Sequence, residues 1–143
     1  MIILFITILV GIDQIIKYYI NTNLYIGQNI TIMEDFLNIT FIKNTGIAFG
    51  LFKSNNLFMI FVVLFLILIL IYFYNREKKK NTLLKIAFIF LISGALGNLI
   101  DRIVYGSIID YINFAFWPAF NLADSLIVMG SILLGIYLIF YTK

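Results

Sequence analysis

Four stretches of the chain are long and apolar enough to cross a lipid bilayer, and they restrict the possible folds more than any other feature. They lie at residues 2–20, 57–75, 83–102 and 121–142. A hydrocarbon layer about 30 Å thick is crossed by roughly 20 residues of helix at about 1.5 Å each. Inside lipid, each backbone amide has to be bonded within the protein, which favours helices. The sequence therefore predicts one integral membrane domain, residues 1–143, with four transmembrane helices.

Composition limits the chemistry that such a protein can perform. Charged residues make up only 12% of the chain, against about 25% in soluble domains. The sequence has no His and no Cys, which excludes disulfides, thiolate metal sites and the catalytic triads that depend on either residue. Carboxylates, amides, hydroxyls and basic side chains remain. We expect a site that uses no metal and no cofactor.

A cluster of basic residues between the second and third spans sets the orientation. Half of the ten Lys and Arg residues of the chain belong to it: Arg76, Lys78, Lys79, Lys80 and Lys85. Between two apolar runs, such a cluster indicates the cytoplasmic side of the membrane rather than a groove for nucleic acid. An even number of spans then places both termini in the cytoplasm. The segments at 21–56 and 103–120 are expected to face outward.

The outward segment 21–56 is too long to be a simple connection between helices. Its Leu37–Phe41 run alternates between apolar and polar residues, as a half-buried strand does. We therefore expect this segment to form β-like structure on the outer face of the membrane. The predicted fold class is an all-α membrane protein with four transmembrane helices and a small extracytoplasmic β-sheet lobe.

In this topology, four acids fall at or near the outer boundary of the membrane: Asp13, Asp101, Asp110 and Asp124. An isolated carboxylate inside the bilayer costs about 3 kcal/mol or more, so such residues are expected to be paired, hydrated or neutral. Polar contacts that hold helices together would account for any one of them. Four acids at one level are more typical of a functional site.

Helical spacing gives three of these acids a polar neighbour three or four residues away on the same face. The pairs are Asn98 with Asp101, Asn121 with Asp124, and Asp13 with Lys17. In the first two pairs, an amide can donate a hydrogen bond to the acid or accept one from it. The third suits an ion pair, or a lysine that extends outward to the interface while Asp13 bonds elsewhere.

Two carboxylates a few ångströms apart cannot both ionise easily, so one of them retains a proton. Such a pair can act as a base and an acid on a single substrate. The ionised member removes a proton from water as the water attacks a carbonyl, and the protonated member donates to the carbonyl oxygen and then to the leaving amine. This chemistry requires neither a metal nor a covalent nucleophile. It therefore suits a chain without His or Cys.

Most of these polar residues belong to short motifs that follow one another along nearly the whole chain. The motifs are DQIIK at Asp13–Lys17, KNTGIAFG at Lys43–Gly50, GALGNLIDR at Gly94–Arg102 leading to GSIID at Gly106–Asp110, and PAFNLADS at Pro118–Ser125. Together they resemble the signature set of lipoprotein signal peptidase, or signal peptidase II, a family of bacterial membrane aspartic proteases. The stretch between Asp110 and Asp124 is shorter than the family pattern.

The resemblance implies an enzyme of the bacterial cytoplasmic membrane with its active site toward the outer face. The implied substrates are prolipoproteins, whose signal peptide is removed just before a Cys that carries a diacylglyceryl group. The implied catalytic pair is Asp110 and Asp124. The implied supporting residues, which face the substrate or the pair, are Asp13, Lys17, Asn44, Gly46, Asn98, Asp101, Arg102 and Asn121. Membrane lipid surrounds such a protein, which is expected to be a monomer without a nucleic-acid partner.

Spacing alone does not rank Asp110 above Asp101 as a catalytic residue. Arg102 directly follows Asp101 and is expected to hold it ionised. Two isoleucines precede Asp110, and this apolar setting is expected to raise its pKa. Asp124 opens the fourth span, where the helix dipole favours a carboxylate. The residues therefore predict opposed environments for the two members of the pair.

Three other interpretations remain open. A structural membrane subunit would tolerate Asp110→Asn. A Ser-Lys protease would use Ser125 or Ser107 as its nucleophile and Lys43 as its base. A proton- or ion-conducting membrane protein would also carry acids in its spans, although these would be spread across the membrane depth. The many aromatic residues are expected to face lipid or the interface rather than to form a binding site, with Trp117 marking the interface in the last outer loop.

Overall fold

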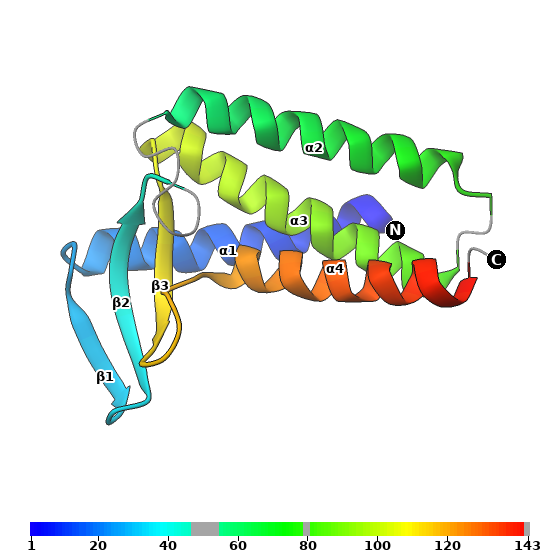
Figure 1. Ribbon diagram of the computed structural model, residues 1–143. Helices are drawn as coiled ribbons and strands as arrows, with labels where there is room; N and C mark the ends of the chain where they lie inside the picture. The colour runs from blue at the N-terminus through cyan, green and yellow to red at the C-terminus, as the bar shows by residue number, and fades with distance from the viewer. Residues whose placement is uncertain (47–54, 79–80, 142–143) are drawn as a thin grey trace.

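The computed structural model of the protein has four long helices and one three-stranded sheet, which lies at one end of the helices (Figure 1). The structure describes residues 1–46, 55–78 and 81–141, so parts of the KNTGIAFG motif and of the basic cluster lie outside the described residues. The helices are α1 (Ile2–Asn23), α2 (Asn56–Arg76), α3 (Thr82–Tyr105) and α4 (Leu122–Tyr141). Each is long and apolar enough to cross a membrane. Together with the sheet, they confirm the predicted class of fold.

Two helices extend further toward the sheet than the apolar stretches indicate. The sequence predicts ends at residues 20 and 102, whereas α1 continues to Asn23 and α3 to Tyr105. These helix ends contact the sheet, although Ile103 and Val104 in the last turn of α3 are 63% and 62% exposed. Ile20 of α1 belongs to a buried apolar cluster with Phe41 of the sheet, and Tyr105 packs against the same cluster. The ends of α1 and α3 therefore serve as the base on which the sheet rests.

The sheet is antiparallel and its strands follow the order β1 (Asn29–Met33), β2 (Leu37–Asn44) and β3 (Ile108–Phe114). The third strand comes from the segment 103–120, for which the sequence predicts only an outward-facing loop. Its first four residues are all buried, so they lack the alternation that marks a half-exposed strand. The register brings the end of β2 at Asn44 beside the part of β3 that carries Asp110.

The helix α3 lies at the centre of the bundle. It packs against α1, α2 and α4, and its contact with α4 is the most extensive. Glycines allow this close approach, because a Cβ on Gly94 would clash with the carbonyl oxygen of Ala123, and a Cβ on Gly130 would lie 2.8 Å from a side-chain carbon of Leu91. Small residues of this kind let helix backbones pack closely in lipid. The start of α4 is thereby fixed on α3.

Replacing Gly94 by Ala is expected to lower the free energy of unfolding by about 1–3 kcal/mol, the usual cost of overpacking a tight contact. The added methyl group meets the backbone of Ala123, which has no rotamer to change, so the start of α4 has to move. Thermal unfolding in lipid–detergent micelles measures the effect. Gly135→Ala on α4 is the matched control, since no described atom lies within 4 Å of the added Cβ there. Equal melting temperatures for the two variants would contradict the proposed tight contact.

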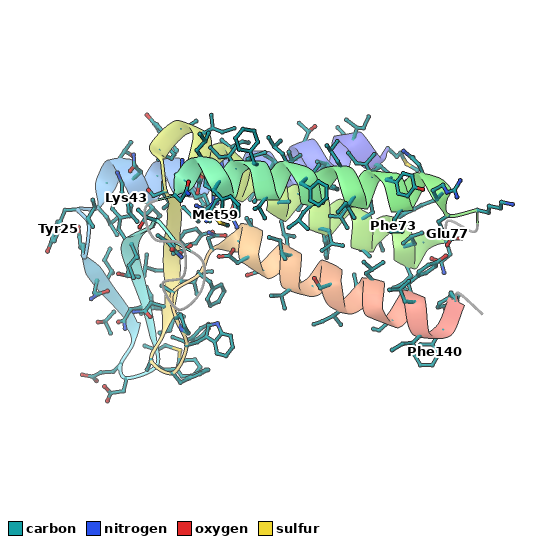
Figure 2. All side chains as sticks on the ribbon, turned by 45° about the horizontal axis from the view of Figure 1, so that its top comes forward. Tyr25, Lys43, Met59, Phe73, Glu77 and Phe140 are labelled. Atoms are coloured by element: carbon teal, nitrogen blue, oxygen red, sulfur yellow. The ribbon has the colours of Figure 1, made fainter. Side chains whose placement is uncertain are left out.

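The sheet and the turn after α2 lie at opposite ends of the bundle. Figure 2 shows Tyr25 and Lys43 at the sheet end, and Phe73 and Glu77 at the other end. The start of α1 and the end of α4 are on the side away from the sheet (Figure 1). The predicted outward segments and the predicted cytoplasmic turn are therefore separated by the length of the helices.

Candidate active site

Lys17 of α1 is the centre of a buried cluster of charges. Its ammonium nitrogen lies 2.9 Å from Asp13 Oδ2 and 2.9 Å from Asp101 Oδ2, and it donates to Asn98 Oδ1 at 3.0 Å. The side chains of Lys17 and both acids have no exposed surface. Each of the three N–H bonds of the ammonium group thus has one acceptor. Of the two arrangements that the sequence allowed, the ion pair with Asp13 is present, and Lys17 does not extend to the interface.

Asp101 is paired with Lys17 and not with the adjacent Arg102, so that expectation is wrong. Successive side chains on a helix point about 100° apart, and Arg102 Nη2 donates instead to the carbonyl oxygen of Gly46 at 3.2 Å. The other oxygen of Asp101 accepts from Gln14 Nε2 at 3.0 Å. Gln14 was not among the predicted site residues, although its place inside the DQIIK motif indicates that it belongs to the site.

The charge cluster also holds two backbone amides near the candidate catalytic acids. Asp101 Oδ2 accepts from the N–H of Ile109 at 3.0 Å, and Asp13 Oδ1 accepts from the N–H of Ala123 at 3.1 Å. Each of these amides belongs to the residue directly before one of the two acids, on β3 and in the first turn of α4. The buried ion pairs therefore position the elements that carry the pair.

Asp124 lies in the first turn of α4, where it forms a capping box with Asn121. The N–H of Asp124 donates to Asn121 Oδ1 at 2.9 Å, and the N–H of Asn121 donates to Asp124 Oδ2 at 3.2 Å. Two amides at the start of the helix are thereby satisfied reciprocally. The second oxygen of Asp124 accepts from Asn98 Nδ2 at 2.7 Å. The carboxylate is held in one orientation by contacts from two helices.

Asp110 is buried on β3 between two amide side chains. Its Oδ2 accepts from Asn44 Nδ2 at 2.9 Å, and its Oδ1 accepts from Asn121 Nδ2 at 2.8 Å. Burial raises the pKa of the Asp110 carboxyl to about 6; the bond from Asn44 opposes this shift, and the nearby charge of Asp124 adds to it. The direction agrees with the apolar setting that the sequence indicates.

Asn121 connects the two acids through one side chain. Its amide group donates to Asp110, while its carbonyl oxygen accepts from the backbone of Asp124. The two hydrogens on Nδ2 have a choice of three acceptors, because Asn98 Oδ1 lies at 3.1 Å and the carbonyl oxygen of Ile109 at 3.3 Å. Asn121 is completely buried. All four of the predicted acids therefore belong to one continuous network.

Three further predicted residues, Asn44, Gly46 and Arg102, hold the end of β2 against α3. The N–H of Gly46 donates to Asn44 Oδ1 at 3.1 Å, and its carbonyl accepts from Arg102. The carbonyl of Arg102 in turn accepts from Asn56 Nδ2 at 2.8 Å, at the start of α2. Within the described residues, Arg102 Nε has no hydrogen-bond partner. The structure thus brings every predicted site residue to the sheet end of the bundle.

A groove with a volume of about 920 Å³ opens onto these residues. Its polar lining comes mainly from Asn44, Asn98, Arg102, Asp110 and Asp124. Its apolar lining comes from α2, beginning at Met59, from the connector between β3 and α4, and from residues of α3, β3 and α4 such as Ala95, Ile108 and Ile127. Figure 2 shows Met59 toward the sheet end of α2. The volume is within the range of about 300–1,000 Å³ that is common for ligand sites.

Of the two alternative nucleophiles, Ser107 is buried and its Oγ has no hydrogen-bond partner among the described residues, whereas the contacts of Ser125 favour a structural role. Ser125 Oγ donates to the carbonyl oxygen of Asn121 at 3.1 Å. Lys43 Nζ, the candidate base, lies 5.8 Å from the centre of the Phe41 ring. The acids of α1, α3 and α4 gather at the sheet end, where a conducting pathway would need polar groups across the membrane depth. Neither alternative is supported by these contacts.

The fold and the site define a multi-pass membrane protein whose four-helix bundle carries a buried network of carboxylates and amides beside a groove. The model of the family described as signal peptidase II matches residues 5–140. The chain belongs to the signal peptidase II family and is a membrane peptidase. With its four spanning helices, it is a multi-pass protein of the bacterial inner membrane.

The relatives match this chain over nearly their whole length. A lipoprotein signal peptidase of Clostridium tetani is 38% identical over 141 residues, which cover 94% of this chain and 90% of the relative. One of Clostridioides difficile is 37% identical over 141 residues, with 97% and 95% covered. A solved structure described as a bacterial membrane enzyme, determined by the in meso method at 2.3 Å, has a TM-score of 0.90 and 34% identity, covering 96% of this chain and 87% of that chain.

Proposed function

We propose that the protein removes the signal peptide from prolipoproteins that carry a diacylglyceryl group, cutting just before the modified Cys, and that Asp110 and Asp124 are the catalytic pair. The observation that carries the proposal is that the two carboxylates share one network through Asn121 and line the same groove. The name of the relatives, lipoprotein signal peptidase, supports this choice of substrate.

In the proposed mechanism, Asp110 holds a proton, because burial raises the pKa of its carboxyl, and Asp124 acts as the base. Asp124 takes a proton from a water molecule as the water oxygen attacks the carbonyl carbon, and Asp110 donates its proton to the carbonyl oxygen. When the C–N bond breaks, Asp124 gives its proton to the leaving amine. One hydroxyl of the intermediate returns a proton to Asp110 as the acid product forms. The pair ends in its starting state.

The supporting residues fix the pair before the substrate arrives. Asn44 and Asn121 hold Asp110, while Asn98 and the capping box hold Asp124. Groups that are already oriented do not have to reorganise during the reaction, which lowers the barrier. The ion pairs of Lys17 fix the helices behind them.

The proposal includes an orientation for the chain. The sheet and the site face the outer side of the membrane, and both termini are cytoplasmic. The basic residues that the structure describes between α2 and α3 support it, since they lie at the end away from the sheet. The chain is proposed to act as a monomer and a single domain within membrane lipid, without a nucleic-acid partner.

Cleavage of a defined substrate tests the proposed function. The purified protein in lipid nanodiscs is given a prolipoprotein with the diacylglyceryl group on its Cys, and mass spectrometry locates the cut. The expected product has the modified Cys as its first residue. The same prolipoprotein without the lipid is the control and is expected to be cut far more slowly. Cleavage at another bond, or equal rates for both substrates, would contradict the assignment.

The rate of cleavage is expected to fall as the pH rises above about 6, because Asp110 then loses the proton that it has to donate. Asn44→Ala removes a hydrogen bond that stabilises the charged form of Asp110, so the pKa of Asp110 rises. The falling limb of the pH–rate profile then moves to higher pH. A bond worth about 1–1.5 kcal/mol corresponds to about one pH unit. The measurement is kcat/KM against pH.

Asn38→Ala, on the same strand, is the matched control and is expected to leave the falling limb in place. A shift of the Asn44→Ala limb to lower pH, or the absence of a shift, would count against Asp110 as the proton donor.

A further inference from the structure

The connector between β3 and α4 carries two exposed aromatic side chains on a rigid support. Phe120 exchanges both backbone hydrogen bonds with Ile112 of β3, at 2.8 and 2.9 Å, and the N–H of Trp117 donates to the carbonyl of Phe114 at 3.1 Å. The ring of Phe116 lies 5.7 Å from that of Phe114, in a stacked arrangement. The connector is therefore a closed turn that is fixed to the sheet, although Phe116 and Trp117 are 72% and 62% exposed.

These two residues line the same groove as the catalytic pair. The lining also includes the face of α2 that carries Met59, Val63 and Leu66. The groove is thus polar at the carboxylates and apolar over much of the rest of its lining. An occupant that matches this division has a polar backbone at the carboxylates and an apolar group attached within reach of both walls.

A lipid-modified peptide combines a polar backbone and a large apolar group at one residue. In the proposed reaction the scissile amide lies at the carboxylates, and the next residue carries two acyl chains. Consecutive Cα atoms are about 3.8 Å apart, so the chains start next to the pair. The connector and α2 are among the apolar surfaces that line the groove around that point.

We propose that Phe116 and Trp117 form a wall that holds the diacylglyceryl chains of the substrate against α2, so that the enzyme reads the lipid as well as the peptide. This inference rests on the proposed function. Acyl chains gain little by moving from lipid to an apolar protein surface, because the two environments are similarly apolar. The contribution of a rigid wall is therefore to position the adjacent amide over the carboxylates.

A comparison of acyl-chain lengths tests the wall. Two substrates with one peptide sequence carry either dipalmitoyl- or dihexanoylglyceryl groups, and kcat/KM is measured for each. Phe116→Ala and Trp117→Ala are each expected to reduce the ratio of kcat/KM for the long-chain substrate to that for the short-chain substrate by about tenfold. Such a factor corresponds to about 1.4 kcal/mol.

Phe140→Ala is the matched control, because Phe140 is 71% exposed at the far end of α4 (Figure 2) and does not line the groove. It is expected to leave the ratio unchanged. An unchanged ratio in both wall variants, or a parallel loss for both substrates, would overturn the inference while leaving the proposed function intact. If the wild-type protein cuts neither substrate, the proposed function itself fails.

Trp117 is the only tryptophan of the chain, so its fluorescence reports binding at the wall directly. The Asp124→Asn variant in nanodiscs is titrated with the long-chain substrate carrying bromine atoms on its acyl chains. Saturable quenching of Trp117 is expected, and an equal amount of brominated phospholipid is expected to quench it less and without saturation. Equal, unsaturable quenching by both would show that Trp117 is only an interfacial residue in contact with bulk lipid, which overturns the inference.

Discussion

Asp110→Asn and Asp124→Asn are each expected to reduce the rate of prolipoprotein cleavage by at least about 10³-fold, because either change removes a group that has to exchange a proton in the reaction. Asparagine has nearly the shape of aspartate, and both positions are surrounded by amide groups that can adapt to it. Folding is therefore expected to be retained. The measurement is single-turnover cleavage, with thermal unfolding as the check on structure.

The double variant sharpens this test. If the two acids act as one pair, the protein with both changes is expected to be about as inactive as either single variant, because removing one member already disables the other. Ser125→Ala is the matched control next to Asp124, and its loss of one bond to the Asn121 carbonyl is expected to leave cleavage near the wild-type level. More than one tenth of the wild-type rate in either single variant would exclude the assignment.

Lys17→Met is expected to lower the free energy of unfolding by about 3–5 kcal/mol, the usual cost of removing one partner from a buried ion pair. Methionine approximately fills the space of the side chain, but Asp13 and Asp101 are then left buried without their cation. Cleavage is expected to be lost as well, because these acids bond the amides of Ile109 and Ala123. Denaturant titration in mixed micelles measures the stability.

Two further variants separate charge from packing at this position. Lys43→Met changes an exposed lysine on β2 and is expected to alter stability by less than about 1 kcal/mol. Adding Asp101→Asn to Lys17→Met removes one of the unpaired charges and is expected to restore part of the lost stability. A Lys17→Met protein as stable as the wild type would show that the cluster is not held by its charges.

The helices could be predicted from the sequence because the bilayer requires long apolar stretches. Their ends could not, since the contacts of Ile20 and Tyr105 with the sheet depend on residues far away in the chain. The strand β3 was missed for a related reason: its first residues are buried on both sides and show no alternation. In each case the local pattern was overridden by contacts with residues far away in the chain.

The members of the site were predicted better than their contacts. Motif membership selected the acids and amides that the structure brings together, but the partner of Asp101 was wrong, because adjacency in sequence is not adjacency on a helix. The capping box could have been read from the spacing of Asn121 and Asp124, which has the asparagine followed by an acid three residues later. The bond between Arg102 and Gly46 depends on the fold and has no local signal.

The network that holds the pair draws on α1, β2, α3, β3 and the first turn of α4. Synthesis delivers these elements from the N-terminus onward, so Asn121 and Asp124 arrive last. A nascent chain that has inserted only three helices contains Lys17 and its partner acids but no pair. If Asp110 and Asp124 are the catalytic pair, the peptidase is expected to be inactive until its final helix has docked.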